Sequence, residues 1–401
     1  MDIKIDDETG RITTMGELPV LEEEKGKTWI DAEGLHVFPG GIDVHVHFRD
    51  PGNPQKEDFY TGSRAALYGG ITTILDMPNT EPKTITLEAL EEKRKIAKEK
   101  AVCDYGLYFG ATNDNYLGAA KSGAIALKIF MAASTGDFYV KDFTSLVKHF
   151  KNFPGMISVH AEDPKTIEAF GRSIKAEIAA VQKVLRLAAN LDRPVHICHV
   201  TSLKTIKVIE EAKRKGVKAT FEMTPHHLLL NEKDLAKHDY LNCLPPLRDE
   251  QEQKILLAHM EKADVFASDH APHTKEEKKG EKKPAGIPGV DVMFRLLLDL
   301  TSKNRLFPVD LAKRIAYNPA RIFNIQRKGF IKSGYDGDLV LVNLEEEYRF
   351  DKTYSKCGWS PYLGRTLWGK IMKVYLRGKE VFNGEEVTAE KGFGKEIEHK
   401  H

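Results

Sequence analysis

Eight short apolar runs with the composition of β-strands recur along the chain, and stretches rich in Ala, Leu, Glu and Lys separate most of them. A strand followed by a helix, repeated eight times, is what a parallel (β/α)8 barrel of the TIM type requires. A doubly wound open sheet is the competing α/β architecture, but no Gly-x-Gly-x-x-Gly sequence follows any of the runs, so the pattern favours the barrel. The strand-like runs are Ile42–Phe48, Thr72–Met77, Asp104–Phe109, Ala124–Met131, Met156–His160, Val195–Val200, Lys218–Met223 and Asp264–Ser268, and the clearest helical stretches are Leu87–Lys100, Thr166–Ala189 and Lys204–Lys215.

Both ends of the chain are β-rich and differ from its middle. Residues 1–40 alternate short apolar pieces with turn signals, which is typical of a few antiparallel strands that are too few to close a core alone. We therefore expect the two ends to pair as a small composite β-sandwich domain of residues 1–41 and 326–395, beside a barrel over residues 42–325. The β-rich pieces near the C-terminus are Asp338–Val342, Ile371–Leu376 and Lys379–Phe382.

Composition narrows the kinds of partner that the chain could bind. The chain has 401 residues, 41% of them hydrophobic, which is enough for a large core. This length also exceeds what a single hydrophobic core usually spans. Lys and Arg number 60 against 59 Asp and Glu, and a net charge of +1 gives no reason to expect nucleic acid or an anionic membrane. A small neutral or weakly charged molecule fits better.

The cysteines and the N-terminus indicate a reducing compartment. The four cysteines are widely spaced and never form a Cys-x-x-Cys pair, which argues against a disulfide framework and a structural zinc knuckle. The first residues lack the apolar core of a signal peptide, and no run of ~18 apolar residues could span a membrane. We therefore predict a soluble, cytoplasmic protein. The cysteines are Cys103, Cys198, Cys243 and Cys357.

Polar residues gather at the C-terminal ends of the strand-like runs, where a barrel enzyme builds its active site. His45 and His47 are two residues apart, so in a strand both side chains project from one face and can bind one metal ion. Taken alone, the pair could equally alternate with valines on a half-buried strand. The whole set combines nitrogen and carboxylate ligands without thiolates, which indicates zinc or another borderline divalent ion in a catalytic site. Its members are His45, His47, Arg49, Asp76, Asn79, Lys128, His160, His199, Asp269, His270 and His273.

Lys128 lies within an apolar run, where a lone ammonium is costly to bury. One interpretation is carboxylation by CO₂, which turns the cation into a carbamate anion that can bridge two metal ions. The other is an amphipathic lysine whose ammonium reaches the barrel rim or pairs with Asp76. The spacing alone leaves both open.

Two further charged features have simple interpretations. The run Glu276–Lys283 is the most highly charged in the chain and is typical of a solvated loop tip. Arg49, taken alone, could form a surface ion pair with Asp50 or Glu57.

Six motifs resemble those of the cyclic amidohydrolases, and together they narrow the resemblance to the dihydroorotases. The resemblance covers nearly the whole chain. Hydantoinases and allantoinases share the metal ligands, but do not usually combine the His226-His227 pair with a histidine four residues after Asp269. The motifs are Pro39–Gly52, Asp76-Met77-Pro78-Asn79-Thr80, Thr224-Pro225-His226-His227-Leu228, Pro245-Pro246-Leu247-Arg248, Ser268–Thr274 and Pro284–Gly289.

The resemblance implies a binuclear zinc site and a binding site for a carboxylated ring. It makes His45, His47 and Asp269 ligands of one Zn²⁺, and His160 and His199 ligands of a second. Carboxylated Lys128 would bridge the two ions. Residues implied to bind the substrate are Arg49, Asn79 and His273 at its carboxylate, and Ala285 and Gly286 at its ring.

The implied activity is the reversible conversion between L-dihydroorotate and N-carbamoyl-L-aspartate in pyrimidine biosynthesis. A metal-bridging hydroxide would attack the ring amide, with Asp269 as the general acid and base. The alternatives are another cyclic-amide hydrolase, of the hydantoinase, dihydropyrimidinase or allantoinase type, and a non-catalytic scaffold. A homo-oligomer and an association with aspartate transcarbamoylase stay open.

One residue departs from the family pattern. Leu244 stands where the long-chain members often have an Asn that contacts the substrate. Asn242 is two residues away and could replace it if the loop shifts, while Arg248 could approach the substrate or pair with Asp249 or Glu250.

Overall fold

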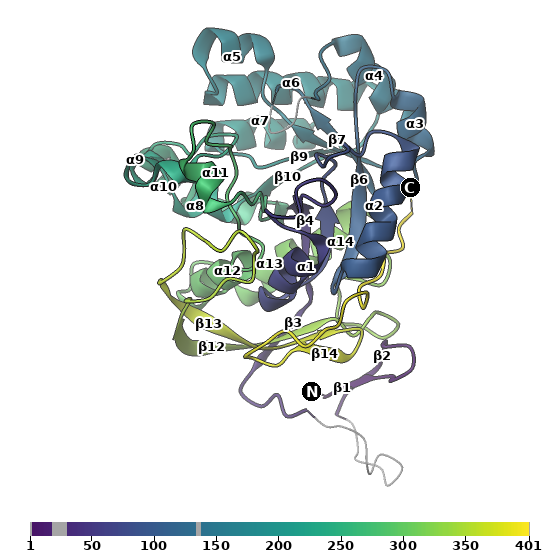
Figure 1. Ribbon diagram of the computed structural model, residues 1–401, viewed down its shortest axis with the longest axis vertical. Coiled ribbons are helices and arrows are strands. Elements are labelled where there is room, and N and C mark those ends of the chain that lie inside the picture. Colours follow the sequence, from purple (N-terminus) through teal and green to yellow (C-terminus); the bar gives the residue numbers. More distant parts are fainter. Residues whose placement is uncertain (1, 18–29, 134–137, 401) are drawn as a thin grey trace.

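The computed structural model describes residues 2–17, 30–133 and 138–400. Its centre is a sheet of eight parallel strands that follow one another in chain order, which confirms the predicted barrel (Figure 1). A bridge between Val46 and His270, in which His47 N donates to His270 O at 2.8 Å, joins the first strand to the segment after the last and nearly closes the barrel. The strands are β4 (Gly41–Val46), β5 (Ile71–Asp76), β6 (Asp104–Gly110), β7 (Ala126–Phe130), β8 (Met156–His160), β9 (Val195–Ile197), β10 (Ala219–Met223) and β11 (Val265–Phe266).

Helices surround the barrel and connect its strands (Figure 1). Their starts are set by capping residues: Asp58 accepts a hydrogen bond from Thr61 N before α1, and Thr86 accepts one from Ala89 N before α2. The helices are α1 (Phe59–Tyr68), α2 (Leu87–Lys100), α3 (Tyr116–Lys121), α4 (Phe143–Asn152), α5 (Pro164–Phe170), α6 (Ile174–Asn190), α7 (Leu203–Arg214), α8 (Pro225–Leu229), α9 (Glu232–Lys237), α10 (Glu250–Ala258), α11 (Lys275–Lys279), α12 (Met293–Ser302), α13 (Pro308–Ala312) and α14 (Asn318–Ile322), with short 3-10 helices at Asp239–Leu241 and Met260–Lys262 and a π-helix at Lys313–Tyr317.

Some of the predicted element boundaries were wrong. The single helix expected over Thr166–Ala189 is two helices, because Gly171 follows α5 with φ +65° and turns the chain out of the helical conformation. The predicted strands Val195–Val200 and Asp264–Ser268 end earlier, at Ile197 and Phe266. Beyond these ends His199 and Asp269 adopt positive φ values of 35° and 45°, which lie outside the β region.

The two ends of the chain contribute to one antiparallel sheet of order β14-β13-β12-β3. Strand β3 (His36–Pro39) pairs with β12 (Leu339–Arg349), which pairs with β13 (Thr366–Leu376) and then β14 (Lys379–Phe382). A separate hairpin of β1 (Asp2–Ile5) and β2 (Ile12–Gly16) lies beyond this sheet in Figure 1. The expected association of N- and C-terminal β-segments is therefore confirmed, while the exact division of the chain into domains stays a prediction.

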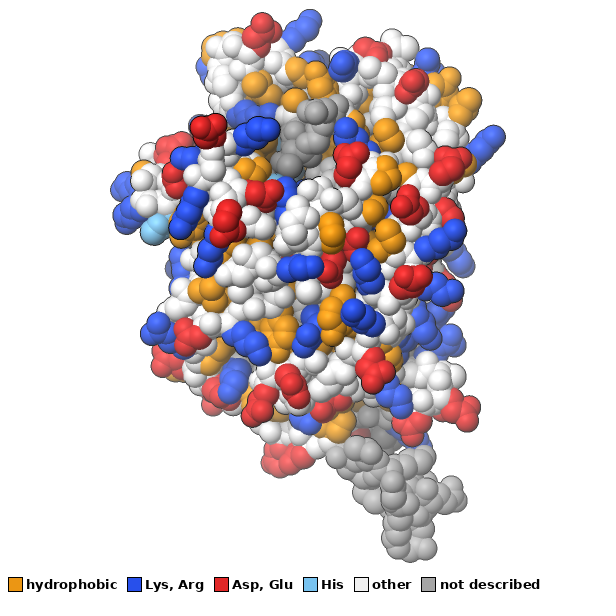
Figure 2. Space-filling view, in the orientation of Figure 1, with side chains coloured by type: hydrophobic (Ala, Val, Ile, Leu, Met, Phe, Trp, Pro, Cys, Tyr) orange, Lys and Arg blue, Asp and Glu red, His pale blue; other side chains and the backbone are white. Residues whose placement is uncertain are grey.

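Buried side chains fill the interior of the barrel. Tyr108 is fully buried, and its hydroxyl contacts Val44 O at 3.1 Å and the Ser158 hydroxyl at 3.2 Å. All four cysteines are buried and unpaired with one another. On the face shown in Figure 2, positive and negative side chains are interspersed. No helix in the described part of the chain is both long and apolar enough to cross a membrane.

Candidate active site

His45 and His47 present equivalent ring atoms to Asp269. His45 Nδ1 lies 2.5 Å from Glu222 Oε1, and His47 Nδ1 lies 2.5 Å from Asn79 Oδ1. Because both oxygens are acceptors, each Nδ1 carries a proton, and this hydrogen bond directs each Nε2 toward Asp269. The two Nε2 atoms lie 3.2 and 3.1 Å from Asp269 Oδ1. A histidine held in this way by a carboxylate or an amide oxygen is oriented to bind a metal.

Asp269 is buried at the mouth of the barrel, three residues after the end of β11 at Phe266. Burial would raise the pKa of its carboxyl, but the charge of His45 and the hydrogen bond from His47 outweigh burial and hold that pKa well below its usual range. Asp43 helps to set the backbone on both sides of this cluster, since its Oδ1 accepts from His45 N at 3.2 Å and Ser268 N at 3.1 Å. Asp269 is therefore held ionised beside the two histidines.

Lys128 is fully buried and reaches neither the barrel rim nor Asp76. Its Nζ lies 3.0 Å from Cys198 Sγ and 3.4 Å from His45 Nε2. Asp76 instead pairs with Lys93, at 2.5 Å. The second interpretation of Lys128 is therefore wrong in both of its forms, and the side chain points into the histidine cluster. The role of Cys198 was not foreseen, because nothing in the sequence pairs it with a residue on β7.

His160 and His199 lie on the other side of the cluster, with their ring centroids 4.6 Å apart. His160 Nε2 contacts Glu162 Oε2 at 2.8 Å. His199 Nδ1 is buried and has no hydrogen-bond partner among the described residues. Burial lowers the pKa of His199 well below its usual value, so its ring is neutral and can donate a lone pair. An unpartnered buried ring nitrogen of this kind fits a metal ligand.

Glu222 on β10 is a site residue that the sequence reasoning missed. Its carboxylate lies against His45, accepts from His199 N at 3.1 Å and contacts His196 Nε2 at 3.0 Å. It therefore links the strands that carry the histidines. Period-two alternation points it inward, but the sequence offers no other signal of its partners.

The donor set fits a bound divalent metal. Ligand atoms of His45, His47 and Asp269 all lie within 4.8 Å of one another and are buried. Nitrogen and carboxylate donors of this kind suit zinc and similar ions. A further buried group, His226, His227 and Cys243, is explained differently, because His227 Nε2 bonds to Pro245 O at 3.0 Å and its Nδ1 to the Thr224 hydroxyl at 2.7 Å.

Arg49 lies beside the histidines and is buried rather than exposed on the surface. Its Nε donates to Pro272 O at 3.3 Å, and its Nη2 lies 3.3 Å from His273 Nε2. His273 Nε2 also contacts Ala285 O at 3.1 Å, while the Lys56 ammonium approaches its Nδ1 at 3.3 Å. The tautomer that satisfies both contacts has a proton on Nε2, so His273 cannot accept from Arg49. The guanidinium therefore keeps donors for a ligand.

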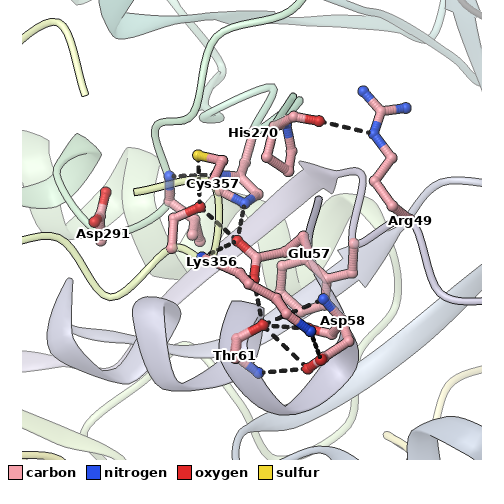
Figure 3. Close-up of polar contacts among 12 residues, drawn as sticks. Arg49, Glu57, Asp58, Thr61, His270, Asp291, Lys356 and Cys357 are labelled. Carbon is pink, nitrogen blue, oxygen red and sulfur yellow. Dashed lines mark hydrogen bonds and ion pairs between the residues drawn. The ribbon is translucent and has the colours of Figure 1, made fainter. Parts of the chain in front are cut away.

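Asp50 and Glu57, the partners considered for Arg49, are engaged elsewhere. Asp50 pairs with Lys100 at 2.8 Å. Figure 3 shows buried Glu57 between the His270 ring and the backbone of Lys356, at 3.3 and 3.2 Å. Its carboxylate also accepts from the Ser355 hydroxyl at 2.5 Å. This network connects the segment before α1, the residue after Asp269 and the C-terminal segment after β12.

A cavity at the barrel mouth brings the predicted site residues together. It is lined by His45, His47, His160, His199 and Asp269, and by Arg49, Asn79, Leu244, Ala285 and Gly286. His273 lies just behind Arg49 and Ala285. Lys128 reaches the same cluster through its contact with His45. The arrangement places a metal-ligand set and a guanidinium around one small space, which suits hydrolysis of an anionic substrate.

Comparison with known proteins also indicates a hydrolase. The sequence profile of the amidohydrolase family matches residues 36–381. The dihydroorotase of Pyrococcus abyssi is 39% identical over 382 residues, which cover 94% of this chain and 90% of that protein. This chain belongs to the dihydroorotases of the amidohydrolase family.

Two other similarities place this dihydroorotase-family chain among its relatives. The multifunctional protein CAD of Squalus acanthias is 34% identical over 92% of this chain, but the match covers only 16% of CAD. The L-hydantoinase (dihydropyrimidinase) of Arthrobacter aurescens has a TM-score of 0.93 at 27% identity, covering 99% of this chain and 96% of that one. The hydantoinase is a relative in fold.

The departure from the usual dihydroorotase sequence at Leu244 is not compensated by Asn242. Leu244 lines the cavity, whereas the Asn242 amide donates to Lys283 O at 2.6 Å. Arg248 neither pairs with Asp249 nor points toward the substrate side of the cavity. Its Nε donates to the Thr201 hydroxyl at 3.0 Å, and its Nη2 lies 3.4 Å from Glu177.

Proposed function

We propose that the chain catalyses the reversible conversion between L-dihydroorotate and N-carbamoyl-L-aspartate. The observation that carries this proposal is the position of Arg49 in the same cavity as His45, His47 and Asp269. A substrate with both a cyclic amide and a carboxylate needs a hydrolytic centre and a cation a short distance apart. The hydantoin and dihydropyrimidine rings of related enzymes lack that carboxylate.

We further propose that His45, His47 and Asp269 would hold one Zn²⁺, and His160 and His199 a second. Carboxylated Lys128 would lie between them. When bound, such ions lower the pKa of water to about 7 and polarise an amide carbonyl. The neutral state of His199 and the Nδ1 hydrogen bonds of His45 and His47 support this assignment, because they direct ring nitrogens into the cluster.

Other steps, proton transfer and substrate binding, would be carried out by residues of the chain itself. Asp269, held ionised, would accept the proton of the attacking water and return it to the ring nitrogen when the ring opens. Arg49, Asn79 and His273 would hold the substrate carboxylate, and the guanidinium can do so with two parallel hydrogen bonds. Ala285 and Gly286 would contact the ring through their backbone.

A comparison of substrates tests this function directly. The purified, zinc-loaded protein should turn over L-dihydroorotate and cyclise N-carbamoyl-L-aspartate, each followed by absorbance or chromatography. Dihydrouracil, hydantoin and allantoin should be hydrolysed at least a hundredfold more slowly. Preference for an uncharged ring would refute the substrate assignment, and no turnover of any ring would favour a non-catalytic scaffold.

Carboxylation of Lys128 makes a separate prediction. Its ammonium faces His45 Nε2 and Cys198 Sγ, and none of the described carboxylates lies within ion-pair distance of it. Conversion to a carbamate would change this charge from positive to negative and supply two oxygens. After chelation, we therefore expect activity to return only when zinc and bicarbonate are supplied together.

The controls for this experiment are zinc alone and bicarbonate alone, both in CO₂-free buffer. Lys128→Ala should bind less zinc and stay inactive with both. Full recovery with zinc alone, or normal turnover by the Ala variant, would contradict carboxylation.

Partners and location also remain proposals. The CAD of Squalus acanthias contains a related segment within a longer multifunctional chain. This supports, by analogy, an association with other enzymes such as aspartate transcarbamoylase. A homo-oligomer and a cytoplasmic location rest on the sequence and the resemblance.

A further inference from the structure

The charged run Glu276–Lys283 contains one residue that is not solvated. Lys278 on α11 is 1% exposed, whereas its neighbour Lys279 is exposed. Thr274 caps this short helix and accepts from Glu277 N at 3.2 Å, which fixes the turn on which Lys278 stands. The prediction of a solvated loop tip is therefore wrong at this position.

Four oxygen atoms surround the Lys278 ammonium. Its Nζ lies 2.6 Å from Asn242 Oδ1 and 3.1 Å from Asn242 O, and 2.9 Å from both Pro284 O and Gly286 O. These oxygens belong to neutral amide groups. Burial lowers the pKa of Lys278 to about 8. A buried ammonium persists only where such acceptors replace its hydration, so the contacts specify one arrangement of the surrounding backbone.

The oxygens belong to the two segments that line the substrate side of the cavity. Leu244 follows Asn242 by two residues, and Ala285 lies between Pro284 and Gly286. Gly286 N also donates to Asn242 O at 3.0 Å, which connects the segments directly. Lys278 therefore holds both walls of this side of the cavity from behind.

The contacts also set the direction of the peptide groups. In a trans peptide the C=O and the following N–H point in opposite directions, so turning Pro284 O toward Lys278 turns Ala285 N–H away from it. Gly286 has φ +145°, and a Cβ at this position would lie 2.3 Å from Ala271 O. The segment thus approaches its neighbour closely and adopts a conformation that few residues other than Gly can have.

The preceding residue of α11 faces His273. Glu277 Oε1 pairs with Lys56 at 2.9 Å, and Glu277 Oε2 lies 3.6 Å from His273 Nδ1. His273 in turn contacts Ala285 O. Adjacent residues of one helical turn therefore support two neighbouring parts of the proposed substrate site.

We infer that Lys278 is a positioning residue that fixes the backbone of Pro284–Gly286 and of Asn242–Leu244 for substrate binding. This inference rests on the proposed function. Lys278 lies behind the cavity wall and outside the metal-ligand set, so it controls the affinity for the ring more than the rate of the chemical step.

The test compares Lys278→Met with Lys279→Met in the zinc-loaded full chain. Met keeps the length of the side chain but removes the charged donors. We expect KM for L-dihydroorotate and for N-carbamoyl-L-aspartate to rise about tenfold or more, as for the loss of hydrogen bonds to a charged group. The value of kcat should stay within about threefold, with zinc content unchanged, and Lys279→Met should behave as the unmutated protein.

A second variant covers the case in which Lys278→Met does not fold. Asn242→Ala removes one oxygen around the ammonium and should raise KM by a smaller factor. An unchanged KM in either folded variant overturns the inference, as does a loss of kcat, zinc and thermal stability at constant KM, which marks a purely structural role. Failure of the proposed function is distinct, because it appears in the unmutated protein as no turnover of either compound.

Discussion

Replacing Asp269 by Asn should lower kcat for L-dihydroorotate by about 10³-fold, within the range for loss of a general acid and base. The carboxylate lies 3.1 Å from His47 Nε2 and is held ionised by its neighbours, so it can accept a proton at neutral pH. An amide of the same shape cannot. Steady-state kinetics in both directions, with zinc measured on the same samples, checks this.

The control for Asp269→Asn is Asp192→Asn, because the Asp192 side chain is 80% exposed and does not belong to the candidate site. It should leave kcat unchanged. If Asp269→Asn kept more than a tenth of the activity at normal zinc content, Asp269 would not be the proton carrier. If activity fell only in proportion to zinc, Asp269 would be a ligand and nothing more.

Replacing Arg49 by Met should lower kcat/KM for L-dihydroorotate by about a hundredfold or more, the loss expected for a charge-assisted pair of hydrogen bonds. Arg49 is buried beside the cavity, and its Nε donates to the backbone oxygen of Pro272, which leaves other donors of the guanidinium for a ligand. Any slow hydrolysis of dihydrouracil should be unaffected, because that ring has no carboxylate. Parallel assays of the two rings measure the difference.

Two variants sharpen the test of Arg49. Arg49→Lys keeps the charge but not the planar pair of donors, so it should recover only part of the lost activity. Arg349→Met changes an arginine whose side chain is 67% exposed and should have no effect. An equal loss on both rings would show that Arg49 supports the fold of the site and does not select the substrate.

Three residues of the candidate site adopt strained backbone conformations. Arg49, His199 and Asp269 have φ values of 61°, 35° and 45°, although none is glycine. Such conformations cost of order 1–3 kcal/mol each and persist only where the surroundings impose them. Here Glu222 accepts from His199 N, and Asp43 accepts from the backbone of Ser268. The positive φ at His199 and Asp269 follows the early ends of β9 and β11 and redirects both side chains.

Local geometry made much of the fold and of the site predictable from the sequence. The alternation of strand-like and helical runs indicated a barrel, and a barrel places every C-terminal strand end at one mouth. The spacing of His45 and His47 placed them on one strand face. Together these rules named the candidate residues that the cavity brings together.

Contacts between distant segments were decided only by the tertiary structure. Glu222 is 177 residues from His45, and Glu57 is 298 residues from Ser355, so no local pattern pairs them. The same holds for Lys128. Its ammonium contacts residues on β4 and after β9, and not the barrel rim or Asp76 as the sequence suggested. Lys278 is the clearest case, because a charged run predicts solvation. Only the folded chain brings four carbonyl and amide oxygens around its ammonium, where they replace water.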